Sequence, residues 1–194
     1  MDALRARIRA EGRNLGNGIL KVDSIINHQL DPTLMLQIGE SLAVYFRHLA
    51  VDRILTAEIS GIVPAMMTGL ALDVPVVYAR KTKPITMAGP VFLETAPSHT
   101  KGIDVNLLVS AEFLPPDQNV LIIDDFLASG RTLQALARMV RSAESRVIGV
   151  GVVIEKSFEG GRELMRQAGY DIPIHALATI SSMAAGQIIF ADED

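Results

Sequence analysis

The chain has 194 residues, 49% of them hydrophobic, which is enough apolar side chain to fill the core of one domain. With 18 basic and 22 acidic residues the net charge is −4, which argues against binding of long nucleic acids but leaves room for a local pocket for a small anion. The absence of cysteine excludes disulfides, zinc thiolates and thiol catalysis. No apolar stretch is long enough for a signal peptide or a membrane helix, so we expect a soluble cytoplasmic protein.

The hydropathy pattern alternates strands with helices. Asp31 and Pro32 are suited to be the N-cap and first residue of one helix, and apolar residues follow at helical spacing. The continuous apolar run from Val120 to Ile123 is typical of a strand buried on both faces. In chain order we expect a surface helix over 3–13, a helix over 32–49, a strand over 53–57, a helix over 63–72, strands over 74–79, 105–110 and 120–123, a helix over 132–143, a strand over 147–154, a helix over 161–168 and a last strand over 174–180.

Residues 81–103 break this alternation. They contain Pro84, Gly89, Pro90, Pro97 and Gly102, with Thr and Ser between them and at most a weak hairpin near 91–95. Connections between elements are usually about 4–6 residues long, so a segment of this length is typically functional or mobile.

This order of strands and helices predicts an α/β fold with a mostly parallel central sheet flanked by helices. Ligands bind such sheets beyond the carboxyl ends of the strands. Three predicted loops occupy that position, over 58–61, 124–132 and 155–158, and each carries polar residues or glycine. We therefore expect the functional site to be assembled from these loops.

The loop at 124–132 carries the most informative pattern. Two carboxylates, Asp124 and Asp125, follow the buried strand, and Ser129, Gly130 and Thr132 precede a helix. Unpaired backbone N–H groups at a helix start, a glycine that allows close approach and two hydroxyls form a cradle for a phosphate monoester. The acids are suited to accept hydrogen bonds from a vicinal diol, so ribose 5-phosphate fits both halves. A capped turn with incidental acids is the alternative, and no P-loop or dinucleotide-binding fingerprint is present.

The whole run from Val120 to Thr132 resembles the signature of the type I phosphoribosyltransferases. Residues 20–24, 27–29, 80–81 and 154–158 are similar, in collinear order, to the xanthine phosphoribosyltransferases within that family. The resemblance implies one domain over 1–194 with the type I fold, a small N-terminal hood from about 1–35 and the C-terminal part, and a flexible lid over about 81–103. It also implies transfer of 5-phosphoribose from 5-phosphoribosyl-1-pyrophosphate (PRPP) to xanthine in purine salvage, which gives XMP and pyrophosphate.

The resemblance also assigns roles to residues. Asp124 and Asp125 would be the catalytic pair at the ribose hydroxyls, and Lys156 would donate to the exocyclic oxygen of a 6-oxopurine. Phe158 would stack on the base or else belong to the core. The residues implied to bind PRPP are Ala128, Ser129, Gly130, Arg131, Thr132, Ser60, Gly61, Arg80 and Lys81, and those implied to bind the purine are Leu20, Asn27, Lys156 and Phe158. From the residues alone, a plain turn at 58–61 and solvated charges at 80–81 and 156 remain open.

Magnesium is the expected cofactor, carried by PRPP without direct ligation by the protein, with Asp124 and Asp125 as the groups that could reach it. No organic cofactor, nucleic acid or membrane partner is expected, and the resemblance implies a homodimer. A guanine- or hypoxanthine-preferring enzyme is the first alternative. A non-catalytic PRPP-sensing regulator is the second, although the roughly 20 residues before the hood motif leave no room for a winged helix. An unrelated α/β binding module would require an accidental match at 120–132.

Overall fold

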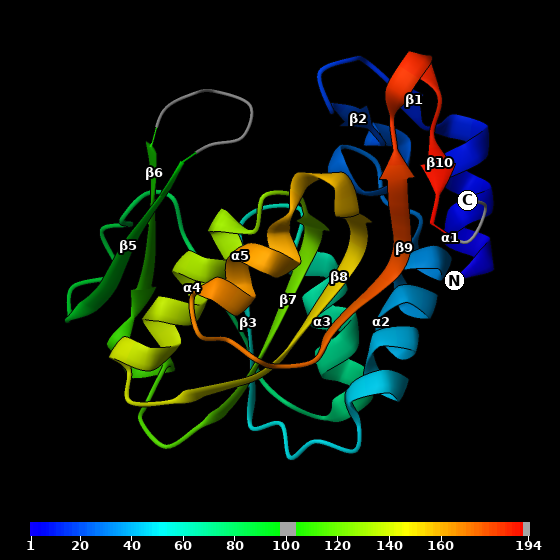
Figure 1. The fold of residues 1–194 in the computed structure, drawn as a ribbon. Helices are drawn as coiled ribbons and strands as arrows, with labels where there is room; N and C mark the ends of the chain where they lie inside the picture. Colours follow the sequence, from blue (N-terminus) through cyan, green and yellow to red (C-terminus); the bar gives the residue numbers. More distant parts are fainter. Residues whose placement is uncertain (98–103, 192–194) are drawn as a thin grey trace.

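The computed structural model describes residues 1–97 and 104–191, built around a sheet of six strands in the order β10-β9-β8-β7-β3-β4 (Figure 1). Five of these strands are parallel, and β10 pairs antiparallel with β9. The strands are β3 (Arg53–Ala57), β4 (Val76–Ala79), β7 (Asn119–Leu127), β8 (Arg146–Lys156), β9 (Ile174–Ser182) and β10 (Ile189–Phe190). The predicted α/β class and mostly parallel sheet are therefore confirmed, but the strand over 174–180 is not the last one, because the short β10 follows it.

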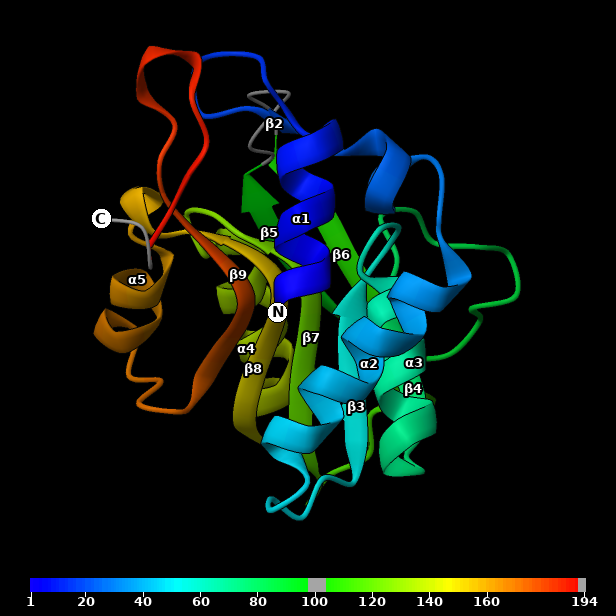
Figure 2. The same ribbon diagram turned by 90° about the vertical axis from the view of Figure 1, so that its right-hand side faces the viewer.

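Helices cover both faces of this sheet, as the alternating pattern predicts. α2 (Pro32–Phe46) and α3 (Ile62–Leu72) lie on one face, and α4 (Arg131–Ser142) and α5 (Gly161–Gln167) lie on the other (Figure 2). The Asp31 carboxylate caps α2 by accepting hydrogen bonds from the backbone N–H groups of Thr33 and Leu34, at 3.0 and 3.2 Å. Buried side chains accordingly form two apolar clusters, one on each side of the sheet. The core thus fixes the strand ends on which the loops are carried.

The N-terminal segment forms a hood above the carboxyl ends of the strands. It consists of α1 (Asp2–Glu11), the short strand pair β1 (Arg13–Asn14) and β2 (Leu20–Lys21), and the π-helix η1 (Asp23–Asn27). The Asn14 amide donates to the carbonyl oxygens of Met183 and Gln187, at 2.7 and 2.8 Å, and so ties the hood to the turn between β9 and β10.

α1 confirms the helix expected at the N-terminus, but one of its faces lies in the core, since Leu4 and Ile8 are fully buried. The hydropathy pattern therefore located this helix and underestimated its packing.

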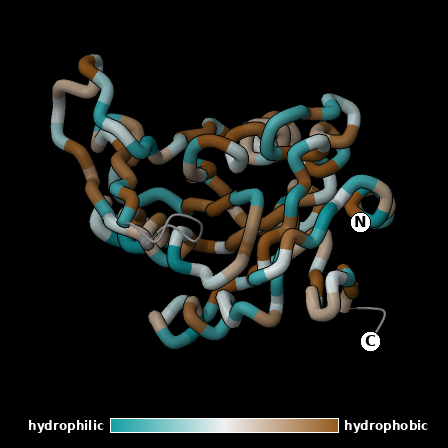
Figure 3. The backbone as a smooth tube through the Cα atoms, turned by 90° about the horizontal axis from the view of Figure 1, so that it is seen from above, coloured by the Kyte–Doolittle hydropathy of each residue, from teal (hydrophilic) through white to brown (hydrophobic). Residues whose placement is uncertain are grey.

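Seen from above, the most hydrophobic segments lie in the central strands (Figure 3).

A second, separate hairpin lies across the sheet from the hood (Figure 1). β5 (Val91–Pro97) pairs antiparallel with β6 (Asp104–Ser110), so the weak hairpin expected near 91–95 is longer than its sequence suggested. The alternating residues Leu107 and Val109 are buried, which attaches β6 to the cluster that includes α4. The predicted lid over 81–103 includes residues 98–103, which lie outside the described residues.

Three 3₁₀ turns complete the described chain, namely η2 (Ala111–Phe113), η3 (Ser157–Glu159) and η4 (Ala184–Gly186). Among the helices of residues 1–97 and 104–191, none combines the length and the apolar character required to cross a membrane.

Candidate active site

A cavity of about 420 Å³ opens at the carboxyl edge of the sheet and is lined by residues of both the hood and the β5–β6 hairpin. The loops over 58–61 and 124–132 and the end of β8 all contribute to it, as the topology predicted. Its lining is formed by Ile19, Leu20, Asn27, Ala57, Glu58, Ile59, Ser60, Gly61, Lys81, Ala96, Val105, Leu107, Asp124, Asp125, Phe126, Ala128, Ser129, Gly130, Arg131, Thr132, Leu133 and Lys156.

The loop between β7 and α4 presents unpaired backbone donors to this cavity. Gly130 has a φ of 79°, a left-handed conformation that glycine adopts without steric cost, and it turns the chain directly into α4. In the part of the chain that the structure describes, no backbone N–H from Ser129 to Thr132 donates a hydrogen bond to a protein acceptor. These N–H groups lie at the positive end of the α4 dipole, an arrangement suited to an anion, and we call residues 129–132 the anion cradle.

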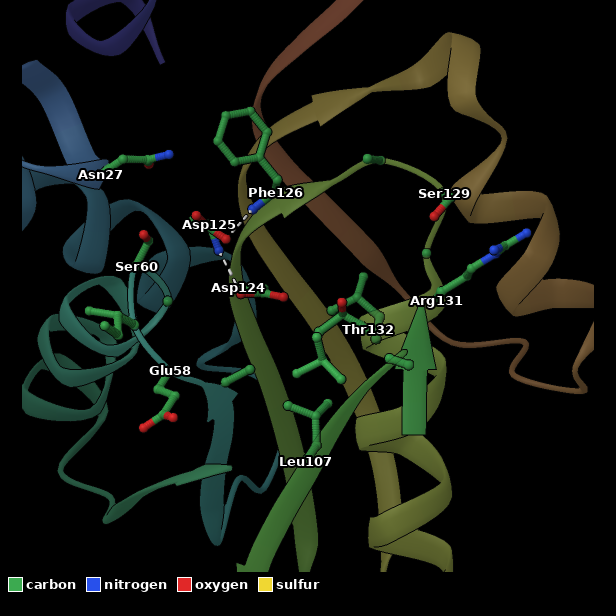
Figure 4. A pocket seen from close by; sticks show the side chains of 18 of the residues that line it. Asn27, Glu58, Ser60, Leu107, Asp124, Asp125, Phe126, Ser129, Arg131 and Thr132 are labelled. Atoms are coloured by element: carbon green, nitrogen blue, oxygen red, sulfur yellow. Dashed lines mark hydrogen bonds between the residues drawn. The ribbon is translucent and has the colours of Figure 1, made fainter. Parts of the chain in front are cut away.

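Asp124 and Asp125 lie between this loop and the turn that carries Ser60 (Figure 4). Asp124 Oδ1 accepts the Asp125 backbone N–H at 3.0 Å, and Asp125 Oδ1 accepts that of Phe126 at 2.9 Å. Burial and the charge of Asp125 raise the pKa of Asp124 well above its usual range, and burial also raises the pKa of Asp125. Two crowded carboxyl groups are therefore held where a polyol or a cation would stabilise their ionised forms.

The 58–61 turn packs directly against this acid pair. A β-carbon at Gly61 would overlap the Thr56 hydroxyl and lie 2.7 Å from Asp124 Oδ1, so only glycine fits here. Ser60 and Gly61 precede α3, and Glu58 Oε1 accepts the Lys81 backbone N–H at 2.7 Å. The turn, Lys81 and the acid pair thus share one wall of the cavity.

The end of β8 contributes a lysine in a fixed position to the cavity lining. The Lys156 side chain is almost fully buried, and its Nζ donates to the Gly18 carbonyl oxygen at 2.8 Å and pairs with Glu159 Oε1 at 2.5 Å. An ammonium group has three N–H donors, so these two partners leave one donor for the cavity. Leu20 and Asn27 line the same region from the hood, which gives a donor, an acceptor and an apolar surface close together.

Two of the predicted site residues lie elsewhere. Arg80 lines a second cavity, and its Nε lies 3.9 Å from Glu58 Oε2, because adjacent residues at the end of β4 point in opposite directions. Phe158 is 44% exposed and is not part of the lining, because η3 turns the chain away from the sheet after Lys156.

Phe126 and Glu58 line the cavity although the sequence did not single them out. The Phe126 ring centroid lies 6.0 Å from Lys156 Nζ, so an aromatic ring of the cavity lining lies near this lysine. The sequence signal that could have identified Phe126 is its position directly after Asp124 and Asp125. Among the described residues, no group of three or more His, Cys, Asp or Glu side chains could hold a metal ion by itself.

Comparison with solved structures agrees with this architecture. The chain superposes on an adenine phosphoribosyltransferase from Rhodothermus marinus with a TM-score of 0.73 and 22% identity, over 93% of this chain and all of that one. An adenine phosphoribosyltransferase from Giardia lamblia, in complex with 9-deazaadenine, gives a TM-score of 0.76 and 19% identity, over 92% of this chain and 98% of that one. The fold is therefore that of the type I phosphoribosyltransferases.

Curated relatives are considerably more similar in sequence. A protein named xanthine phosphoribosyltransferase from Deinococcus deserti is 49% identical over 96% of this chain and 95% of its own length. One with the same name from Oceanobacillus iheyensis is 45% identical over all of this chain and 98% of its own length. The profile described as "Phosphoribosyl transferase domain" matches residues 33–171, a segment that includes the 58–61 turn, the acid pair and the anion cradle. Most of the cavity lining lies within this match, and the chain belongs to the phosphoribosyltransferase family.

Proposed function

We propose that this protein is a xanthine phosphoribosyltransferase that transfers 5-phosphoribose from PRPP to xanthine, giving XMP and pyrophosphate. The observation that carries the proposal is the unpaired N–H cradle at 129–132, which shares one cavity with the acid pair and a fixed lysine. A sugar carrying a phosphate and a diol fits the first two features, and a base with an exocyclic oxygen fits the third. The full-length identity to proteins of that name supports the choice of base.

In this proposal the cradle holds the 5-phosphate of PRPP, while Asp124 and Asp125 accept hydrogen bonds from the ribose hydroxyls. Bond breaking at the anomeric carbon leads bond making, so positive charge develops on the sugar. The carboxylates lie beneath that charge, and their field stabilises it without needing to reorganise. Burial and crowding make ionisation of this acid pair costly. The positive charge that develops on the sugar therefore interacts strongly with the ionised carboxylates.

Magnesium fits this site because the acid pair offers hard oxygen donors whose burial raises their pKa, so a nearby cation favours the ionised forms. We infer that substrate oxygens hold most of its coordination sphere, with Asp124 or Asp125 within reach. Bound there, the ion would neutralise charge on the leaving pyrophosphate. The backbone of Ser60 and Gly61 and the ammonium of Lys81 lie on the same wall and would bind the pyrophosphate from the protein side.

A comparison of purine bases tests the proposal. We expect kcat/KM with PRPP and magnesium to be at least about tenfold higher for xanthine than for guanine or hypoxanthine, because a site built on hydrogen bonds rejects a base whose groups leave its donors unpaired. Steady-state kinetics with the three bases measure this. A preference for guanine would overturn the choice of base, and the absence of pyrophosphate release with all three would overturn the activity.

Removing the fixed donor should separate the two substrates. Lys156→Ala is expected to raise the Kd or KM of the purine by about 10–100-fold and to change the affinity for PRPP by less than about threefold, because a charged hydrogen bond is worth about 1.5–3 kcal/mol. Isothermal titration with each substrate measures both values. Arg166→Ala is the control, since Arg166 is 68% exposed and pairs with Glu163 on the surface of α5. An equal loss of both affinities would contradict the assignment of Lys156 to the base.

Three further features of the sequence prediction stay predictions. We propose that β5 belongs to the lid over 81–103, since Ala96 lines the cavity from its described part. A lid would keep water from the developing cation. The homodimer and the cytoplasmic location complete the proposal.

A further inference from the structure

The anion cradle rests on the backbone of a neighbouring helix. A β-carbon on Gly130 would lie 2.8 Å from the Gly161 carbonyl oxygen and 3.0 Å from Gly161 Cα. In the reverse direction, a β-carbon on Gly161 would overlap the Ala128 carbonyl oxygen and lie 3.0 Å from the Gly130 nitrogen. The first turn of α5 and the loop over 128–130 are therefore in direct backbone contact, and the Leu127 side chain packs against Gly161 at the same place.

The start of α5 is itself held in place by an ion pair. Glu155, which is buried at the end of β8, accepts two hydrogen bonds from the Arg162 guanidinium, at 2.6 and 2.7 Å. Arg162 also donates to the Ile174 carbonyl oxygen at 2.8 Å. A bidentate pair of this kind fixes orientation as well as distance. Gly161, the residue before Arg162, is thereby anchored to the ends of β8 and β9.

We propose that Gly161 is a positioning residue that sets the conformation of the phosphate cradle from behind, through α5 and the Glu155–Arg162 pair. The inference rests on the proposed binding of the PRPP 5-phosphate at 128–132. Backbone donors must be positioned to within a few tenths of an ångström to keep N···O distances of about 2.7–3.2 Å to the phosphate oxygens, and a loop without its own side-chain cap needs external support. The contact with Gly161 supplies that support.

The segment from Lys156 to Gly161 then contacts both substrate regions. Lys156 at its start faces the purine side of the cavity, and Gly161 at its end lies against the phosphate side. The short turn between them includes Glu159, which pairs with Lys156. Only a displacement of the whole segment would move both the purine donor and the phosphate cradle, whereas a local change at Gly161 leaves Lys156 held by the Gly18 carbonyl and Glu159.

Gly161→Ala tests the inference because its effects on helix and cradle differ. Alanine is a better helix former than glycine, so the substitution at the first residue of α5 does not by itself disfavour the helix. The new methyl group must however displace the Ala128 carbonyl and the Leu127 side chain, or else the start of α5. We expect the Kd for PRPP, measured by titration calorimetry, to rise about 10–100-fold, with a much smaller change in the Kd for xanthine.

Gly149→Ala is the matched control. It adds the same methyl group at a crowded position of β8, 2.8 Å from the Phe46 ring, but at the end of the sheet opposite the cavity. We expect it to lower the melting temperature and to leave the Kd for PRPP unchanged. An unchanged Kd in Gly161→Ala, or an equal rise in both variants, overturns the inference. Absence of PRPP binding by the unmodified protein overturns the proposed function, which is a distinct result.

A second variant keeps the test decisive if Gly161→Ala does not fold. The double variant Glu155→Gln/Arg162→Met releases the start of α5 without leaving a buried unpaired charge. We expect it to raise the Kd for PRPP about 3–10-fold, with the maximal signal of xanthine binding retained. Affinity for PRPP equal to that of the unmodified protein would show that the anchor does not set the cradle.

Discussion

Asp125→Asn is expected to lower kcat by about 10²–10³-fold while raising the melting temperature at about pH 8. The amide keeps the shape of the side chain but removes the charge that would face the developing cation. It also removes a carboxylate whose pKa is raised by burial and which lies next to Asp124, whose pKa is raised by burial and by the charge of Asp125. Relief of this crowding should contribute about 0.5–2 kcal/mol to the free energy of unfolding. Turnover kinetics and thermal unfolding of the same preparation measure both effects.

The gain in stability should depend on pH in a defined direction. A carboxyl group whose pKa is higher in the folded than in the unfolded chain favours folding while it is protonated, and this contribution is lost as the pH rises through the folded-state pKa. The unmodified protein should therefore lose stability from about pH 4 upward relative to the variant, since an unfolded Asp titrates near about 3.9. The difference in melting temperature should be absent below that range and largest in alkali.

Asp73→Asn provides the control for charge removal as such. Asp73 lies at the end of α3 in a left-handed conformation that Asn also accepts, away from the cavity lining. Both its activity and the pH dependence of its melting temperature should match those of the unmodified protein. If Asp125→Asn turned over like the unmodified protein, the pair would have no electrostatic role. If its melting temperature showed the same pH dependence as the control, Asp125 would not titrate as described.

Gly130→Val should have the second large effect, a rise of about 100-fold or more in the KM for PRPP. A β-branched residue at a φ of 79° costs about 1–2 kcal/mol in backbone strain alone. Its β-carbon would also meet the Gly161 carbonyl at 2.8 Å, so the loop must move away from α5. The N–H groups that bind the phosphate would move with it, and initial-rate kinetics with varied PRPP measure the loss.

Gly169→Val separates backbone strain from displacement of the cradle. Gly169 has a φ of 85°, and a β-carbon at this position would have no neighbouring atom within 4 Å, so valine there adds strain in open space. This variant should be less stable and should keep the KM for PRPP. If the two valine variants shifted that KM equally, general destabilisation would explain the effect and the cradle assignment would be lost.

The sheet, the helices and the phosphate side of the site are predictable because their signals are local. Asp31 before Pro32 marks the start of α2, and the apolar run from Val120 precedes both acids and the glycine that turns the chain. A glycine at position 130 permits a positive φ, and the structure has a φ of 79° there. Consecutive residues carry each of these features, so no knowledge of distant contacts is needed.

The differences between the sequence prediction and the structure come from contacts between segments that are distant in the sequence. β10 has two residues and forms only against β9, and the hairpin of β5 and β6 depends on burial of Leu107 and Val109. No sequence pattern indicates that the carbonyl of Gly18 orients Lys156. The position of Phe158 outside the cavity lining has a similar cause, because the turn after β8 decides it.

The hydrogen bonds between the Asn14 side chain and the β9–β10 turn affect the order in which the protein can fold during synthesis. Chains emerge from the ribosome N-terminus first, at about 5–20 residues per second. The hood is thus synthesised well before the carbonyl groups that hold it, those of Met183 and Gln187. A nascent chain can assemble part of its sheet early, but the hood that lines one side of the cavity is held in place only after the β9–β10 turn has been made.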